Sequence, residues 1–240
     1  MLLILETAFL RPTSTAMSDS AIAVKICGLT STEQAEAVAA MGAQAIGVIG
    51  VEASPRFVAE PSRRTLFAHL QEHHPQVDRV WVVADLSDAQ LEDAISGRGC
   101  PSVVQLHGDE SGQRCAELRQ KYPHTKWWKA LRVRTPGDLE TLQSYDNCVD
   151  ALLLDAWSPD QLGGTGHRLD LRWLEKLEHQ LPEGMPWWLA GGISAEWVPD
   201  LLSQIKPHGL DASSRLEIKP GLKDLAKVAD LLQAVKEIGV

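Results

Sequence analysis

The feature that most constrains the fold of this chain is a regular alternation of two kinds of segment from residue 21 onward. Short apolar runs, typical of buried parallel strands, alternate with longer segments typical of helices. The apolar runs read AIAVKIC, AQAIGVIGV, RVWVVADL, SVVQLHG, KWWKALRV, ALLLDAW, PWWLAGGI and HGLDASS. Strict alternation of strand and helix requires a parallel sheet, and eight such units allow that sheet to close without an edge strand.

This alternation predicts an α/β fold, a single (β/α)8 barrel of parallel strands with outer helices, over residues 21–240. The alternative is a doubly wound open sheet, which usually has fewer strands and a GxGxxG loop after the first one. The sequence has no GxGxxG motif. Residues 1–20 lack the basic start of a secretory signal, so we expect an extension outside the barrel, with Met17 as an alternative start to Met1.

Composition narrows the class of protein and of partner. A net charge of −9 argues against a nucleic acid or an anionic membrane surface as a partner. No apolar run approaches the length needed to span a bilayer. The four cysteines show neither CxxC nor zinc-site spacing, which predicts reduced thiols, no metal site and a cytoplasmic location.

The first apolar run brings a thiol to the expected active-site end of the barrel. In this fold the carboxyl ends of the strands surround the mouth where ligands bind. Cys27 and Gly28 end the run, and Thr30 or Ser31 is a candidate N-cap for the helix that follows. On this segment alone, a small buried apolar residue is the simpler interpretation of Cys27.

Small and hydroxyl-bearing residues follow the last three apolar runs. In this fold a phosphate usually binds at the loops after strands seven and eight, beside a short helix for which the segment RLE is a candidate. Backbone N–H groups can approach a ligand closely at glycine. The pattern predicts a phosphorylated small-molecule ligand, with these candidate contacts: Gly163, Gly164, Gly191, Gly192, Ser213 and Ser214.

Six segments resemble phosphoribosylanthranilate isomerases, in the same order and over residues 21–235. They are KICGLT, SPRFV, QLHGDE, LLLD with GGTG after it, AGGI and LDASSRLEIKPGLKD. The resemblance implies conversion of N-(5-phosphoribosyl)anthranilate to 1-(2-carboxyphenylamino)-1-deoxyribulose 5-phosphate in tryptophan biosynthesis. It also implies no cofactor, a phosphosugar substrate as the partner, and a monomer or a homodimer.

The resemblance places the general base at Cys27 and the general acid at Asp155. A carboxylic acid can protonate the ring oxygen so that the sugar opens to an imine, and a thiolate can then remove the C2 proton. An ordinary thiol has a pKa of about 8.5 and is largely protonated at neutral pH. We expect Lys25 and nearby helix N-termini to lower the pKa of Cys27.

The resemblance also suggests binding residues. Arg56 matches an arginine that holds the anthranilate part, whose carboxylate suits a bidentate guanidinium. Gln105 and His107 lie on the same face of the fourth strand, and a core histidine remains an equal interpretation of His107. Asp211 is expected to organise the mouth of the barrel. The chain departs from the family pattern at three positions near the expected substrate contacts: Ala156, His167 and Arg215.

Three other functions fit the same barrel. Indoleglycerol-phosphate synthase or a histidine-pathway isomerase would share the phosphate loops but need other acid–base residues. A metal-dependent pentose-phosphate epimerase would need His and Asp ligands at several strand ends, where this chain offers few. A non-catalytic binding barrel would be expected to lack Cys27 or Asp155, and both are present.

Overall fold

The computed structural model describes residues 21–156, 177 and 180–238, and its centre is a closed barrel of eight parallel strands. The strands follow one another around the barrel in chain order, and the eighth pairs with the first. Their bounds are β1 (Ala23–Cys27), β2 (Ala45–Ile49), β3 (Asp78–Val83), β4 (Val103–Leu106), β5 (Lys126–Val133), β6 (Ala151–Ala156), β7 (Trp187–Ala190) and β8 (Gly209–Ala212). The predicted (β/α)8 barrel is confirmed.

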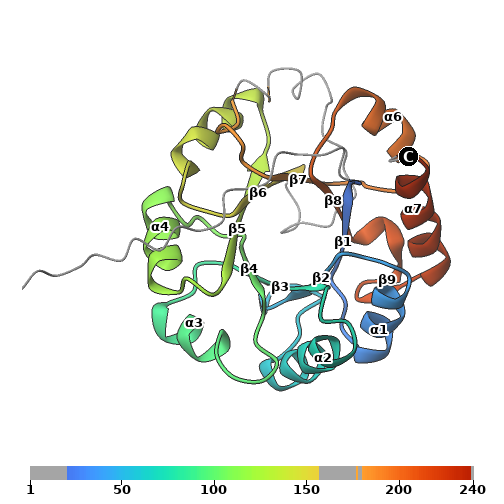
Figure 1. Cartoon of the computed structure of the whole chain (residues 1–240), viewed down its shortest axis with the longest axis horizontal. Coiled ribbons are helices and arrows are strands. Elements are labelled where there is room, and N and C mark those ends of the chain that lie inside the picture. Colours follow the sequence, from blue (N-terminus) through green and yellow to red (C-terminus); the bar gives the residue numbers. More distant parts are fainter. Residues whose placement is uncertain (1–20, 157–176, 178–179, 239–240) are drawn as a thin grey trace, which may run out of the picture.

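Helices form a layer around the outside of the strands (Figure 1). They are α1 (Thr32–Ala40), α2 (Glu60–His73), α3 (Asp88–Ala94), α4 (Gly112–Lys121), the 3-10 helix η1 (Pro136–Tyr145), α6 (Val198–Gln204) and α7 (Leu225–Ile238). The segment DLRWLEKLEH at residues 170–179, one of those typical of helices, falls almost entirely outside the described residues, as do residues 1–20. No helix in the described ranges is long and apolar enough to cross a membrane.

Alternating side chains separate the inside of the barrel from the helix layer. Trp128 and Trp188 belong to the cluster inside the barrel, whereas Trp127 and Trp187 belong to the cluster under the helices. The rings of Trp128 and Trp188 lie 4.7 Å apart, centroid to centroid. Gly209 makes room for this pair, since a Cβ there would lie 2.4 Å from the Trp188 ring. The two tilted indoles therefore pack against each other inside the barrel, while the preceding tryptophan on each strand points to the helix layer, as the alternation of side chains along a strand requires.

A small hairpin follows β8 and docks on the start of α1. The predicted short helix at RLE is present as η3 (Ser214–Leu216), and β9 (Glu217–Lys219) and β10 (Leu222–Lys223) then form an antiparallel pair that the sequence analysis did not predict. The Thr30 hydroxyl donates to the carbonyl of Gly221 at 2.8 Å. The Gln34 amide bonds both backbone groups of Lys223, each at 3.0 Å. These bonds fix the hairpin at the mouth of the barrel.

Candidate active site

The carboxyl ends of the strands enclose a cavity of about 800 Å³ that is open at the mouth of the barrel. Every predicted site residue that the structure describes lines this cavity: Cys27, Arg56, Gln105, His107, Asp155, Gly191, Gly192, Asp211, Ser213 and Ser214. The other two predicted residues, Gly163 and Gly164, lie outside the described residues.

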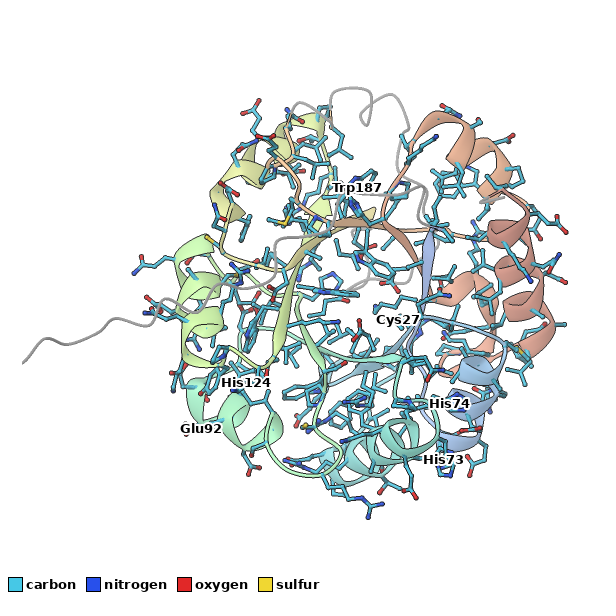
Figure 2. The ribbon with its side chains drawn as sticks, viewed as in Figure 1. Cys27, His73, His74, Glu92, His124 and Trp187 are labelled. Atoms are coloured by element: carbon cyan, nitrogen blue, oxygen red, sulfur yellow. The ribbon has the colours of Figure 1, made fainter. Side chains whose placement is uncertain are left out.

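Cys27 ends β1 and lies inside the ring of helices, with 7% of its surface exposed (Figure 2). Its neighbour on β2 is Gly47, and a Cβ at that position would lie 2.7 Å from the Cys27 sulfur. The same Cβ would lie 3.1 Å from the Lys25 side chain. The glycine therefore gives the inward-pointing amine and thiol of β1 the space that they occupy.

Lys25 and Asp211 form a buried ion pair beside Cys27. The two residues are register partners on β1 and β8, and Lys25 Nζ donates to Asp211 Oδ2 at 2.8 Å. Burial alone lowers the pKa of Lys25, but the Asp211 carboxylate and the Cys27 sulfur raise it by more. Burial raises the pKa of Asp211, and Lys25 offsets this only in part. Asp211 Oδ1 has no hydrogen-bond partner among the described residues and is a candidate acceptor for a ligand.

The expected lowering of the Cys27 pKa is wrong, because the pKa lies above its ordinary value. Burial raises the pKa of the thiol, and the positive charge of Lys25 lowers it by less. The negative charge of Asp211 also acts against Lys25. Because Lys25 already pairs with a carboxylate, its charge is only partly available to a thiolate, and Cys27 rests as a thiol.

Asp155 is the penultimate residue of β6 and lies on a different side of the mouth from Cys27. In the closed barrel, β7 and β8 separate β6 from β1. Only 6% of Asp155 is exposed, and its Oδ2 lies 3.4 Å from Nε2 of His107. His107 follows β4 and lines the cavity together with Gln105, as their shared strand face predicted. His107 is therefore a cavity residue rather than a core residue.

A network of charged groups fixes the loop that carries His107. Asp85 has a positive φ of 51° and its carboxylate accepts from the backbone N–H of Asp109 at 2.8 Å. Glu110 accepts from the backbone N–H of Asp85 and from Lys129 Nζ, both at 2.8 Å. Strained backbone at a functional site persists only where its surroundings hold it. None of the residues Asp85, Glu110 and Lys129 is among those predicted for the site from the sequence.

Arg56 is held by a contact that the sequence did not indicate. Its Nε and Nη2 donate to the two carboxylate oxygens of Glu217 at 2.9 and 2.7 Å, and both side chains are buried. This edge of the guanidinium is therefore not free to hold an anthranilate carboxylate. Lys223 Nζ donates to the same carboxylate at 2.7 Å.

Glu217 and Lys223 are not among the residues predicted for the site, although both lie in the stretch RLEIKPGLKD. The signal that could have revealed them is the Pro-Gly turn between two oppositely charged residues, which is typical of a hairpin with facing charges.

The candidate phosphate loops have the expected backbone. Gly191 and Gly192 adopt φ values of 101° and 67°, a region that favours glycine. The Ser213 hydroxyl donates to the carbonyl of Cys27 at 3.0 Å, which joins the loop after β8 to the end of β1. Ser214 and Arg215 also line the cavity.

Comparison with known proteins identifies the family. A family model described as N-(5'phosphoribosyl)anthranilate (PRA) isomerase matches residues 24–234. This chain belongs to the phosphoribosylanthranilate isomerase family. The N-(5'-phosphoribosyl)anthranilate isomerase of Synechococcus elongatus is 43% identical to it over 212 residues, which cover 88% of this chain and 95% of that protein.

Solved structures of phosphoribosylanthranilate isomerases share the fold and most of the length. Monomers derived from the dimeric enzyme of Thermotoga maritima match with a TM-score of 0.76 at 25% identity, over 90% of this chain and 99% of that one. A phosphoribosylanthranilate isomerase in complex with reduced 1-(o-carboxyphenylamino)-1-deoxyribulose 5-phosphate matches with the same values.

As a member of this isomerase family, the chain is an enzyme of tryptophan biosynthesis. Of its three departures from the family pattern, Arg215 lines the cavity and Ala156 ends β6. His167 lies outside the described residues.

Proposed function

We propose that Cys27 and Asp155 are the general base and general acid with which this chain isomerises N-(5'-phosphoribosyl)anthranilate. The observation that carries the proposal is that the two proton-transfer groups line one cavity, from β1 and β6, at the same mouth as the candidate phosphate loops. The rearrangement needs an acid at the ring oxygen and a base at C2, and a side chain that is placed within reach of each atom can perform either role.

Asp155 acts first. Its carboxylic acid gives a proton to the furanose ring oxygen as the bond from that oxygen to C1 breaks. The nitrogen lone pair forms the C1=N bond, which leaves an iminium ion and a carboxylate. His107, 3.4 Å from the Asp155 carboxylate, is placed to hold that charge.

Cys27 acts second. Its thiolate removes the C2 proton, and the electron pair moves toward nitrogen to give the enolamine. Loss of the proton of the C2 hydroxyl and gain of a proton at C1 then give the ketone. Burial favours the thiol form of Cys27. The thiol must first lose its own proton, which passes to water at the open mouth of the cavity. The positive iminium beside the sulfur adds to the charge of Lys25 and favours this ionisation.

The remaining residues bind the two ends of the substrate. Gly191, Gly192, Ser213 and Ser214 are proposed to hold the phosphate through N–H and hydroxyl donors, with Gly163 and Gly164 in the same role. Asp211 and Gln105 offer buried oxygens, Oδ1 and Oε1, that have no hydrogen-bond partner in the described part of the chain. These oxygens suit sugar hydroxyls. A cytoplasmic location, a barrel domain over residues 21–240 and a monomer or homodimer stay predictions.

The test is the decay of substrate fluorescence with purified protein, beside Cys27→Ala and Asp155→Asn variants. General acid–base catalysis contributes about 10²–10⁴-fold, so each variant should lose activity on that scale while keeping the circular dichroism of the parent. Cys148→Ala, which changes a thiol far from the cavity residues, is the matched control and should keep its activity.

Two outcomes would contradict the proposal in different ways. Activity that survives in both folded variants would remove Cys27 and Asp155 from their roles. A folded parent that binds the reduced product analogue without turning over substrate would favour a non-catalytic binding barrel.

A further inference from the structure

Three charged side chains, Arg56, Glu217 and Lys223, form a buried cluster at the rim of the cavity, which we name the rim triad. Their side chains are 6%, 4% and 0% exposed. Glu217 lies at the centre, with the guanidinium on both carboxylate oxygens and the ammonium on Oε1. The triad brings together the loop after β2 and the hairpin after β8.

The rim triad touches the backbone that carries the proposed base. Gly28, directly after Cys27, has a φ of 80°, and a Cβ there would lie 2.6 Å from Arg56 Cδ and 3.3 Å from Ser213 Oγ. Lys223 Nζ donates to the carbonyl of Ser213 at 3.2 Å. Arg56 therefore crosses the chain one residue beyond the thiol, beside the loop proposed to hold the phosphate.

The guanidinium has a second edge. Arginine carries five N–H donors in a planar fork, and Glu217 occupies the edge formed by Nε and Nη2. Arg56 lines the cavity, and no hydrogen bond from its Nη1 is found among the described residues. The edge formed by Nη1 and Nη2 is thus the one that a carboxylate in the cavity could use in a bidentate manner.

The charges of the rim triad also favour the binding of an anion at the second edge of Arg56. One carboxylate faces two basic groups, and a buried charge is costly unless it is paired. An anion that reaches Arg56 from the cavity would complete the pairing. The substrate of the proposed function supplies one in its aromatic carboxylate.

We propose that Glu217 is a positioning residue that fixes Arg56 so that its free edge selects substrates with a carboxylate on the aromatic ring. This inference rests on the proposed function. Glu217 acts through Arg56 and does not touch the reacting atoms. A purely structural Glu217, which only held the hairpin, would affect ligands with and without that carboxylate alike.

The experiment compares two competitive inhibitors. One is reduced 1-(o-carboxyphenylamino)-1-deoxyribulose 5-phosphate, and the other is its phenylamino counterpart without the carboxylate. Glu217→Gln should weaken the first inhibitor about tenfold or more, since charge-assisted hydrogen bonds are worth that much, and the second less than about twofold. KM should rise with the first inhibition constant while kcat changes little. Equal weakening of both inhibitors, or of neither, would overturn the inference.

A double-mutant cycle tests that Glu217 acts through Arg56. In an Arg56→Ala background, Glu217→Gln should add no further loss, whereas independent effects would multiply and contradict the inference. Glu72→Gln, which breaks the exposed Arg98–Glu72 pair, is the matched control and should change neither inhibition constant. Glu217→Asp keeps the charge, is measured in parallel, and should retain part of the discrimination.

The two proposals fail separately. A wild-type protein without turnover would contradict the proposed function. Turnover by the wild type with an unchanged Glu217→Gln variant would contradict the positioning role alone.

Discussion

Two of the buried cation–carboxylate pairs near the mouth of the barrel are held in different ways. Lys25 and Asp211 are register partners on neighbouring strands, so the pairing of β1 with β8 brings their side chains together. Arg56 and Glu217 lie on a loop and on a hairpin, and their contact depends on the hairpin being docked against α1. Strand register thus places the charged pair at the centre of the mouth, whereas the docking of a loop and a hairpin places the pair at the rim.

The largest loss of stability is expected when the Lys25–Asp211 pair, which strand register holds, is broken. Lys25→Met leaves the Asp211 carboxylate buried without its partner, and breaking a buried pair in this way costs about 3–5 kcal/mol of unfolding free energy. Urea denaturation measures it. Lys126→Met, which removes the exposed partner of Asp78, is the control and should cost less than about 1 kcal/mol. A smaller loss of unfolding free energy for Lys25→Met than for Lys126→Met would contradict the view that strand register holds the more important pair.

A second variant, Gly221→Ala, should disturb the Arg56–Glu217 pair at the rim without disturbing the Lys25–Asp211 pair at the centre. Gly221 lies in the turn of the hairpin with a φ of 82°, and a Cβ there would lie 2.9 Å from the Thr30 methyl group. Gly221→Ala should cost about 1–3 kcal/mol through the strained backbone and the contact. It should also raise KM, because Glu217 moves with the hairpin, and leave the Lys25–Asp211 pair in place.

The control for Gly221→Ala is Gly42→Ala, because Gly42 also has a positive φ but has no side chain or backbone near the position of the added Cβ. Gly42 has a φ of 100°, and nothing lies within 4 Å of a Cβ built there. Gly42→Ala should lose stability by the backbone cost alone and keep the wild-type KM. An equal rise of KM in both variants would show that the docked hairpin does not control the rim.

The same contrast explains what the sequence could predict. Strand ends of a barrel converge on one mouth, and alternate residues share a face, so Cys27, Gln105, His107 and Asp155 could be assigned to one cavity before any coordinates. The candidate phosphate contacts after β7 could also be predicted from the sequence, because two glycines, Gly191 and Gly192, stand next to each other there. These predictions need only periodicity and order along the chain.

The positions that sequence analysis missed or misjudged depend on contacts between distant loops. Arg56 and Glu217 are 161 residues apart, and no local pattern indicates that they meet. The direction of the Cys27 pKa shift depends on burial and on the prior pairing of Lys25 with Asp211, neither of which is visible in the segment KICG. Positive φ at Asp85 likewise depends on Glu110, which lies in another loop.

The smallest expected effect is a pH dependence that belongs to the rim alone. Burial acts to raise the pKa of Glu217, but hydrogen bonds from Arg56 and Lys223 outweigh it, so the pKa lies below its ordinary value of 4.5. A lowered folded-state pKa gives stability that is present above 4.5 and lost as pH falls through the lower folded value. Glu217→Gln resembles the protonated side chain, so its stability deficit against wild type should narrow as the pH is lowered from 6 toward 3 in about half-unit steps of urea denaturation. The exposed Glu72→Gln control should show little deficit at any of these pH values. A Glu217→Gln deficit that stays constant or widens on acidification would mean that the Glu217 charge does not stabilise the rim, and the contrast between the two pairs would then rest on the strand register alone.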